Sequence, residues 1–440
     1  MEINNTPIVP FGVWSVCNWN TNVDTINTCE TWVSWYPNVT FTHKPVRGDT
    51  SVLYRWDAFS PYFAAEEMYY SVHQSKYNIG ARKDEPYFFG YMINPEEPIN
   101  QTEVEDGIAD YATNKAFDSE HPIGWATLWY QRDTRNVSEG SDYIIWDEYH
   151  NRVNCGTYES YKYSSCTTLG FTKGKYMLGL QRDFYLHMLD SGGFTGLEQI
   201  PKPVFYTSLQ QNQSYVLDGD YFFQLTPQQL RTEAIWAFTA GFVGYDIWHN
   251  ILWTTNWEGY GMGSNQSTAI VADKLAGDIM SAEMQEVLTL PTLNYSVLHS
   301  SYRTWDEKVN FSVNPTETVY TSFTGVSLSY RLKHNTTSDK YYLIVANVNN
   351  ITVNSTVTIQ GLSGTMNATT IGITGTGSDA PGQVHTVIDG GFEESFSPFS
   401  GNVYEISTDA AEEPPASTSF SICGSGCDSS WSNFWYEGKP

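Results

Sequence analysis

An apolar run that ends at two glutamates constrains this chain more than any other stretch. Residues 87–93 read Tyr-Phe-Phe-Gly-Tyr-Met-Ile, and Glu96 and Glu97 follow between two prolines. A continuous apolar run of this length is typical of a strand buried on both faces, as in a parallel sheet. The acids then stand at the carboxyl end of that strand, where parallel barrels place their chemistry. Glutamates before a helix also complement its positive end, so a purely structural interpretation stays open.

A helix and a second strand are predicted directly after these acids. Residues 102–105 have the spacing of a capping box, and one face of the helix would carry Val104, Ile108, Tyr111 and Ala112. The pattern breaks over residues 118–122, which read Asp-Ser-Glu-His-Pro, and a new apolar run begins at Ile123. This stretch therefore predicts one strand–helix–strand unit.

The alternation of strand and helix extends over residues 8–290. We predict strands at residues 8–15, 38–43, 51–57, 87–93, 123–129, 142–150, 202–211 and 242–250. We predict helices at residues 63–70, 102–117, 176–189, 226–241 and 268–288. The helix at 226–241 has the clearest signals, with Thr226 as its cap, Pro227 in the first turn and Gly241 at its exit. Eight strands with crossovers are the count of a closed barrel, so the predicted fold class is α/β with a (β/α)8 barrel.

Beyond residue 290 the pattern changes to short alternating strands. These are predicted at residues 319–323, 326–330, 341–347, 356–359 and 402–406, which indicates an antiparallel β-sandwich. Residues 408–440 differ again, with a Glu-Glu-Pro-Pro spacer, a serine-rich run and an aromatic end at Trp431, Phe434, Trp435 and Tyr436. We expect a barrel over residues 1–291, a sandwich over 292–407, and a linker with an extended tail over 408–440.

Charge and motifs exclude several classes of partner and cofactor. The chain has 49 acidic and 23 basic residues, a net charge of -26, so a nucleic-acid backbone would be repelled. No stretch is long and apolar enough to span a membrane, and we expect that the numbering begins on a mature or trimmed product. The histidines occur singly, and phosphate-loop and dinucleotide motifs are absent, so we predict no metal and no cofactor.

Cysteines and glycosylation motifs indicate an oxidising, extracellular environment. Of the fifteen connectivities that six cysteines allow, proximity favours the pairs Cys17–Cys29, Cys155–Cys166 and Cys423–Cys427. Asn-x-Ser/Thr motifs occur at Asn4, Asn38, Asn100, Asn136, Asn212, Asn265, Asn294, Asn310, Asn335, Asn350, Asn354 and Asn367. We therefore predict a secreted, extracellular or cell-surface protein that carries N-linked glycans.

The order of these elements resembles a glycoside-hydrolase-type TIM barrel whose fourth strand ends in Asp-Glu-Pro, here Glu96-Glu97-Pro98. The resemblance covers residues 8–290 and implies a glycosidase with Glu97 as general acid/base. Two departures stand out. The larger clan has Asn-Glu at the fourth strand, whereas Pro95 separates Asn94 from Glu96 here. The clan also ends its seventh strand in a nucleophilic glutamate, and this chain has Gln210-Gln211.

The second catalytic acid is left open. A retaining mechanism needs two carboxyl groups about 5 Å apart, and an inverting one needs about 6.5–9.5 Å. Asp147, Glu148 and Asp246 all stand at predicted strand ends. Asp246 and Trp248 alternate onto one strand face, which suits an acid beside a sugar-stacking ring and also suits a packed core. Further candidate substrate contacts are Glu96, Gln210, Trp14, Trp129 and Trp146.

Two functions from different classes follow from these residues. In the first, a secreted, glycosylated glycosidase cleaves or binds carbohydrate at the barrel mouth. In the second, the barrel is catalytically degenerate and serves as a structural subunit of an extracellular filament or coat, self-assembling through its C-terminal tail. The carboxylates favour the first function. The amides at 210–211 and the aromatic tail, which would be costly to leave in water, favour the second.

Overall fold

The computed structural model describes part of the chain, and all structural statements below concern that part. The described residues are 2–3, 6–14, 34–44, 63–65, 67–73, 83–93, 101–127, 139–147, 152–154, 204–210, 215–217, 220–222, 225–249, 266–297, 309–313, 328–347, 352–373 and 380–407. The predicted strand at 51–57, the helix at 176–189, the strand at 319–323, all six cysteines and the tail lie outside them.

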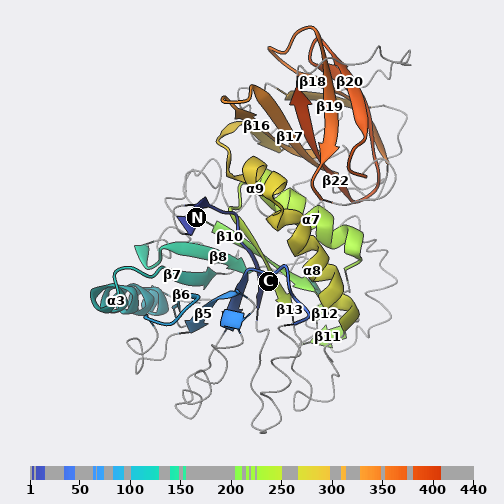
Figure 1. Cartoon of the computed structure of the whole chain (residues 1–440). Coiled ribbons are helices and arrows are strands. Elements are labelled where there is room, and N and C mark those ends of the chain that lie inside the picture. The colour runs from blue at the N-terminus through green and yellow to red at the C-terminus, as the bar shows by residue number, and fades with distance from the viewer. Residues whose placement is uncertain are drawn as a thin grey trace. The chain divides into compact units, whose positions relative to one another are not determined.

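Eight parallel strands close into a barrel (Figure 1). In chain order they are β3 (Phe11–Trp14), β4 (Phe41–Lys44), β5 (Tyr69–His73), β6 (Phe88–Met92), β7 (Ile123–Thr127), β8 (Tyr143–Asp147), β10 (Val204–Gln210) and β13 (Gly244–His249). Each pairs in parallel with its neighbour in sequence order, and β13 returns to pair with β3. The predicted barrel is therefore confirmed.

The third strand of the barrel is not where the sequence placed it. Residues 63–70 were expected to form a helix, but only Phe63–Ala65 is helical, and Glu67 adopts a positive φ of 53° that ends the turn. Tyr69 and Tyr70 instead open β5, where they pair with Phe41 and Thr42 of β4. Paired tyrosines followed by Ser-Val-His favour a strand once two neighbouring strands are available to pair with. The helix prediction at 69–70 is wrong for this reason.

Helices α3 (Gln101–Phe117) and α8 (Gln266–Met280) lie in the same compact unit as the barrel strands. α3 begins at Gln101, before the expected cap, so Thr102 lies in its first turn and is not its cap. Its buried face has Val104, Gly107 and Asn114, whereas Ala112 is exposed. The helix predicted at 268–288 is divided at Ser281, whose hydroxyl accepts a hydrogen bond from the Met284 backbone and caps a new helix, α9 (Ala282–Thr289).

Short strands also form two small sheets. β1 (Glu2–Ile3) pairs with β2 (Thr6–Pro7), and β9 (Arg152–Asn154), β11 (Tyr215–Leu217) and β12 (Asp220–Phe222) form a three-stranded sheet.

No helix in the described part of the chain is both long and apolar enough to cross a membrane.

The C-terminal strands form the predicted antiparallel sandwich. They are β14 (Thr292–Val297), β15 (Val309–Val313), β16 (Leu328–Asn335), β17 (Lys340–Asn347), β18 (Val353–Ile359), β19 (Thr365–Ile371), β20 (Val384–Ile388), β21 (Gly391–Phe396) and β22 (Ser400–Ser407). Their order in the sheet is β14-β16-β17-β22-β19-β20-β21-β18-β15. Alternate residues of β18 and β19 are buried, as expected for strands with one face on a core. β14, β15, β19, β20 and β21 were not predicted.

Helix α7 (Pro227–Ala240) belongs by its contacts to the sandwich unit, although it joins two barrel strands in the chain (Figure 1). Its predicted ends are confirmed, with a complete capping box at Thr226 and a left-handed Gly241 at its C-terminus. Arg231 donates 2.6 Å to the carbonyl of Gly401, and the Thr239 hydroxyl lies 2.5 Å from that of Ser329. The helix covers the face of β16, β17 and β22 that turns away from the sandwich core.

Candidate functional site

The barrel interior is filled by side chains. A cluster of buried apolar residues contributed by β4, β6, β7, β8 and β10 consists of Phe41, Phe89, Met92, Ala126, Tyr143, Ile145 and Phe205. Tyr143 stacks on Phe205 with ring centroids 5.0 Å apart, and Phe41 meets Phe89 edge to face at 4.5 Å. The interior is thus a packed core, as is usual for a closed eight-stranded barrel.

A carboxylate lies inside this apolar core. Asp246 on β13 is 0% exposed, and its register partner on β3 is Gly12. A Cβ atom built on Gly12 would lie 2.0 Å from Oδ1 of Asp246, closer than real Cβ atoms approach any neighbour. Gly12 is therefore the residue whose missing side chain makes room for the carboxylate.

Two further polar side chains share this interior. The pKa of the Tyr143 phenol is raised, first by its burial and then by the negative charge of Asp246, while a hydrogen bond with Ser71 acts in the opposite direction. Ser71 on β5 is 0% exposed. A phenol with a raised pKa stays protonated near neutral pH and can serve only as a hydrogen-bond donor or acceptor there.

The strand register relates Asp246 to a second predicted acid. Thr207 on β10 pairs with Asp246 on one side and with Asp147 on the other. Neighbouring strands are about 4.8 Å apart, so the backbones of the two aspartates lie at one level of the barrel, about 10 Å from each other. Trp14 and Trp248 are likewise register partners, two positions closer to the carboxyl ends than Gly12 and Asp246.

The remaining predicted site residues are located only in part. Gln210 is the last residue of β10, as the sequence indicated. Trp146 is 3% exposed and packs edge to face on Phe242, with ring centroids 5.7 Å apart, so its ring has no open face for a sugar. Glu96, Glu97, Trp129 and Glu148 lie outside the described residues.

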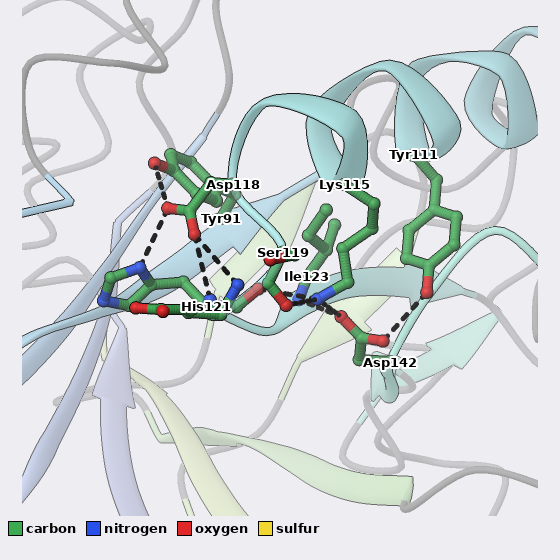
Figure 2. A network of polar contacts seen from close by, with 9 residues as sticks. Tyr91, Tyr111, Lys115, Asp118, Ser119, His121, Ile123 and Asp142 are labelled. Atoms are coloured by element: carbon green, nitrogen blue, oxygen red, sulfur yellow. Dashed lines mark hydrogen bonds and ion pairs between the residues drawn. The ribbon is translucent and has the colours of Figure 1, made fainter.

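A second polar network lies at the amino ends of β7 and β8, and sequence reasoning did not find it (Figure 2). Asp118, which follows α3, accepts hydrogen bonds from the Tyr91 hydroxyl at 3.0 Å and from the backbone nitrogens of Glu120 and His121 at 3.1 Å. His121 Nδ1 lies 2.8 Å from the same carboxylate. Burial alone would raise the pKa of Asp118, but these hydrogen bonds and the charge of His121 lower it.

The other half of the network is built on Asp142. Its carboxylate accepts from the Tyr111 hydroxyl at 2.8 Å and from the Ile123 backbone at 2.9 Å, and it pairs with Lys115 at 2.9 Å (Figure 2). Lys115 also donates 2.9 Å to the carbonyl of His121. Barrels place their chemistry at the opposite, carboxyl ends of the strands, so this network is best explained as a clamp that fixes α3 onto the sheet.

Comparison with known proteins does not assign a family. No family model matches the chain, and no curated protein matches it. Similar solved structures include an α-amylase from Geobacillus thermoleovorans complexed with acarbose (9% identity, 91% of this chain and 98% of that chain, TM-score 0.48). Others are a GH51 α-L-arabinofuranosidase from Thermotoga petrophila (12%, 86% and 89%, 0.42) and a GH30 endoxylanase from Clostridium papyrosolvens (9%, 90% and 96%, 0.40). With TM-scores below 0.5 these likenesses carry no argument about function, and the fold assignment rests on the strand order itself.

Proposed function

We propose that the barrel binds carbohydrate at the carboxyl ends of its strands and cleaves glycosidic bonds there. The observation that carries the proposal is the register of β8, β10 and β13, which sets Asp147 and Asp246 on either side of Thr207. Glycoside hydrolysis needs two carboxyl groups that face each other across the scissile bond. Two acid positions at one level of a closed barrel give two alternative places for the carboxyl group that would act with Glu97.

The roles follow from the resemblance of the sequence. Asp147 and Asp246 are alternative positions for the partner of Glu97, so the distance of about 10 Å between their backbones does not choose between a retaining and an inverting mechanism. Glu97 follows β6 in the chain and is proposed as the general acid. Asp147, Glu148 or Asp246 would then supply the second carboxyl group, and the pair Trp14 and Trp248 would supply ring faces for the sugar.

The test is hydrolysis of a panel of aryl glycosides and polysaccharides by the full-length protein. Glu97→Gln, Asp147→Asn and Asp246→Asn should be assayed separately, and loss of the acid or base should lower kcat by about 10²–10⁴-fold. Asp142→Asn is the matched control, because it removes a carboxylate from the amino end of the same strand β8. Full activity of both Glu97→Gln and the two aspartate variants would refute the assignment.

A structural role is the second candidate. It is favoured by one observation: β10 ends in the amide Gln210, at the position where the resembling clan has its nucleophile. In this case the chain would be a subunit of an extracellular filament or coat. Carbohydrate binding without turnover, measured by calorimetry, together with assembly that depends on residues 408–440, would support this role.

We further propose that the protein is secreted and N-glycosylated. Two of the motifs in the described part of the sandwich, Asn354-x-Thr356 and Asn367-x-Thr369, lie on the partly exposed outer faces of β18 and β19. Asn38 differs, because its side-chain amide donates 2.8 Å to Asp273 of α8 and its backbone nitrogen donates 2.7 Å to the same carboxylate. We therefore expect Asn354 and Asn367 to be glycosylated more fully than Asn38, which mass spectrometry of the secreted protein can measure.

A further inference from the structure

Two exposed apolar side chains on one strand stand out on the sandwich. Among the described residues, four large hydrophobic side chains are exposed, and two of them are Val384 (59%) and Ile388 (53%). Both lie on the outer face of β20, on either side of Thr386, and the inward Val387 between them is fully buried. Single exposed hydrophobic residues are common on proteins, but two that flank one position invite a common explanation.

The register supplies that explanation. Thr386, the residue between Val384 and Ile388, is the cross-strand partner of Asn367 on β19. Asn367 begins the motif Asn-Ala-Thr, and Thr369 of that motif is itself the partner of Val384. Opposite residues have Cβ atoms about 5 Å apart and diagonal ones about 7–8 Å, so both apolar side chains lie within reach of a group attached to Asn367.

We propose that Asn367 carries an N-linked oligosaccharide whose first sugar rings lie over Val384 and Ile388. The carbon–hydrogen face of an N-acetylglucosamine ring is apolar, and it can cover aliphatic side chains while its hydroxyl groups stay in water. The bond forms between Nδ2 of Asn367 and C1 of the sugar as the bond from C1 to the oxygen of the lipid diphosphate donor breaks. The lipid diphosphate leaves with the electron pair, and the proton lost from Nδ2 passes to a base of the transferring enzyme. This inference rests on the proposed secretion and N-glycosylation of the chain, and it does not depend on the proposed activity of the barrel.

A second motif in the same sandwich provides a matched control. Asn354 on β18 also lies on an outer, partly exposed face, but its cross-strand partner on β21 is Ser395. The diagonal neighbour on that strand is Glu393, which pairs with Thr356. A glycan on Asn354 would therefore stand over polar side chains, and its removal should uncover no apolar surface.

The experiment uses the full-length protein secreted from a eukaryotic host. Glycopeptide mapping should find Asn367 occupied. Removing that glycan by Asn367→Gln should lower Tm by about 2–4 °C and raise the binding of an apolar dye severalfold. Thr369→Ala, which abolishes the motif and keeps Asn367, should reproduce both effects. Asn354→Gln should shift Tm by less than these variants do.

A double-mutant cycle then separates contact with the glycan from loss of the sugar alone. Val384→Thr together with Ile388→Thr should lower Tm in the glycosylated protein, and in the Asn367→Gln background it should lower dye binding toward the original level. These side chains are exposed, so the variants should retain the fold. An unmodified Asn367 would overturn the proposal, and so would strictly additive effects of the two changes on Tm.

Discussion

Gly12 and Asp246 occupy a space inside the barrel that has room for one side chain only. Gly12→Ala would bring a Cβ atom to within 2.0 Å of the Asp246 carboxylate, and the next nearest side chain, Phe41, is also part of the packed core. Overpacking of this kind costs about 1–3 kcal/mol in the free energy of unfolding. Denaturant unfolding of the full-length variant measures that cost.

Gly391→Ala is the control for this change. Gly391 also lies in a strand, but the nearest atom to its added Cβ is 3.4 Å away, an ordinary contact. Alanine should be tolerated there with little effect. Alanine reduces the freedom of the unfolded chain equally at both positions, which favours folding, so equal destabilisation by the two variants would contradict an effect specific to the Asp246 carboxylate.

Lys333 should make stability depend on pH. Its side chain is 5% exposed, and Nζ donates 2.5 Å to the Leu288 carbonyl and 3.0 Å to that of Leu290, at the C-terminus of α9. Burial, with a smaller contribution from the charge of Arg331, lowers the pKa of Lys333 from 10.5 to about 7. At pH values between these two pKa values, the Lys333 amine is protonated to a greater extent in the unfolded chain than in the folded one. The free energy of unfolding should therefore rise with pH in this range.

The measurement is the free energy of unfolding in denaturant from about pH 7 to pH 10. At most, the slope from one such group is about 1.4 kcal/mol per pH unit. Lys333→Met, which keeps the length of the side chain and removes the amine, should flatten the rise over this window. A slope unchanged in Lys333→Met would assign the effect to other groups.

The clamp between α3 and the sheet depends on Asp118. Asp118→Ala removes hydrogen bonds from Tyr91, His121 and the Glu120 backbone, and it takes this acceptor away from the buried Tyr91 hydroxyl. We expect a loss of about 2–3 kcal/mol in unfolding free energy, measured by urea titration. Glu120→Ala is the control, since the exposed side chain of Glu120 lies two residues further along the loop and its loss should change stability by less than about 0.5 kcal/mol.

Acid should weaken the same clamp. Because the pKa of Asp118 is lowered in the folded protein, its stabilising contribution is present above the ordinary value of 3.8 and is lost as the pH falls through the folded value. The acid-induced destabilisation should therefore be smaller in Asp118→Ala than in the unaltered protein. Parallel acid titrations that coincide for the two proteins would contradict this.

Elements with local signals could be predicted from the sequence, and those that depend on partners could not. α7 was found at its correct ends because Thr226, Pro227 and Gly241 act within one or two turns. β5 was missed because its tyrosines become a strand only between β4 and β6. β19, β20 and β21 are short and contain many polar residues. Which of their side chains face the core is decided by the pairing register with neighbouring strands, so the alternation of apolar and polar residues alone does not identify them.

The same limit applies to the candidate site. Asp246 could be named from its place in an apolar strand, but its relation to Asp147 comes from the pairing of both with Thr207. Ser71, Tyr143 and Gly12 approach Asp246 from β5, β8 and β3, none of which is its own strand. A glycine inside a predicted strand was the one available signal, since it marks a close approach of another group. The clamp at Asp118 lies in a loop, where spacing alone gives little information.

We expect that residues 1–291 do not form an independently stable domain. α7 joins β10 to β13 in the chain, yet Arg231, Thr232 and Thr239 bond to groups of the sandwich at Gly401, Phe399 and Ser329. A protein that ends at residue 291 would lose these bonds and would expose the face of α7 that the sheet covers. We expect it to show no cooperative thermal unfolding, whereas a protein of residues 1–407 should unfold as the full chain does. A stable, cooperative 1–291 fragment would contradict this.

The tail is predicted to act outside its own domain. Deleting residues 408–440 should abolish self-association and leave the thermal unfolding of the barrel and sandwich unchanged. The deletion removes four aromatic residues near the end of the chain, whose burial on a partner surface would drive the association. Light scattering over a range of concentrations gives the particle size. Assembly of the truncated protein equal to that of the full chain would end the idea of tail-driven association.

The position of α7 in the chain determines how long this helix is present during synthesis before the sheet that it covers has been made. Arg231 and its acceptor Gly401 are separated by 170 positions. At roughly 5–20 residues per second, the ribosome makes the acceptor about ten to thirty seconds after the donor. During that interval the helix has emerged without the sheet it is to cover, and its apolar face is open to chaperones and to neighbouring nascent chains. Slower translation of residues 241–401 should therefore lengthen this exposed period and reduce the yield of folded protein.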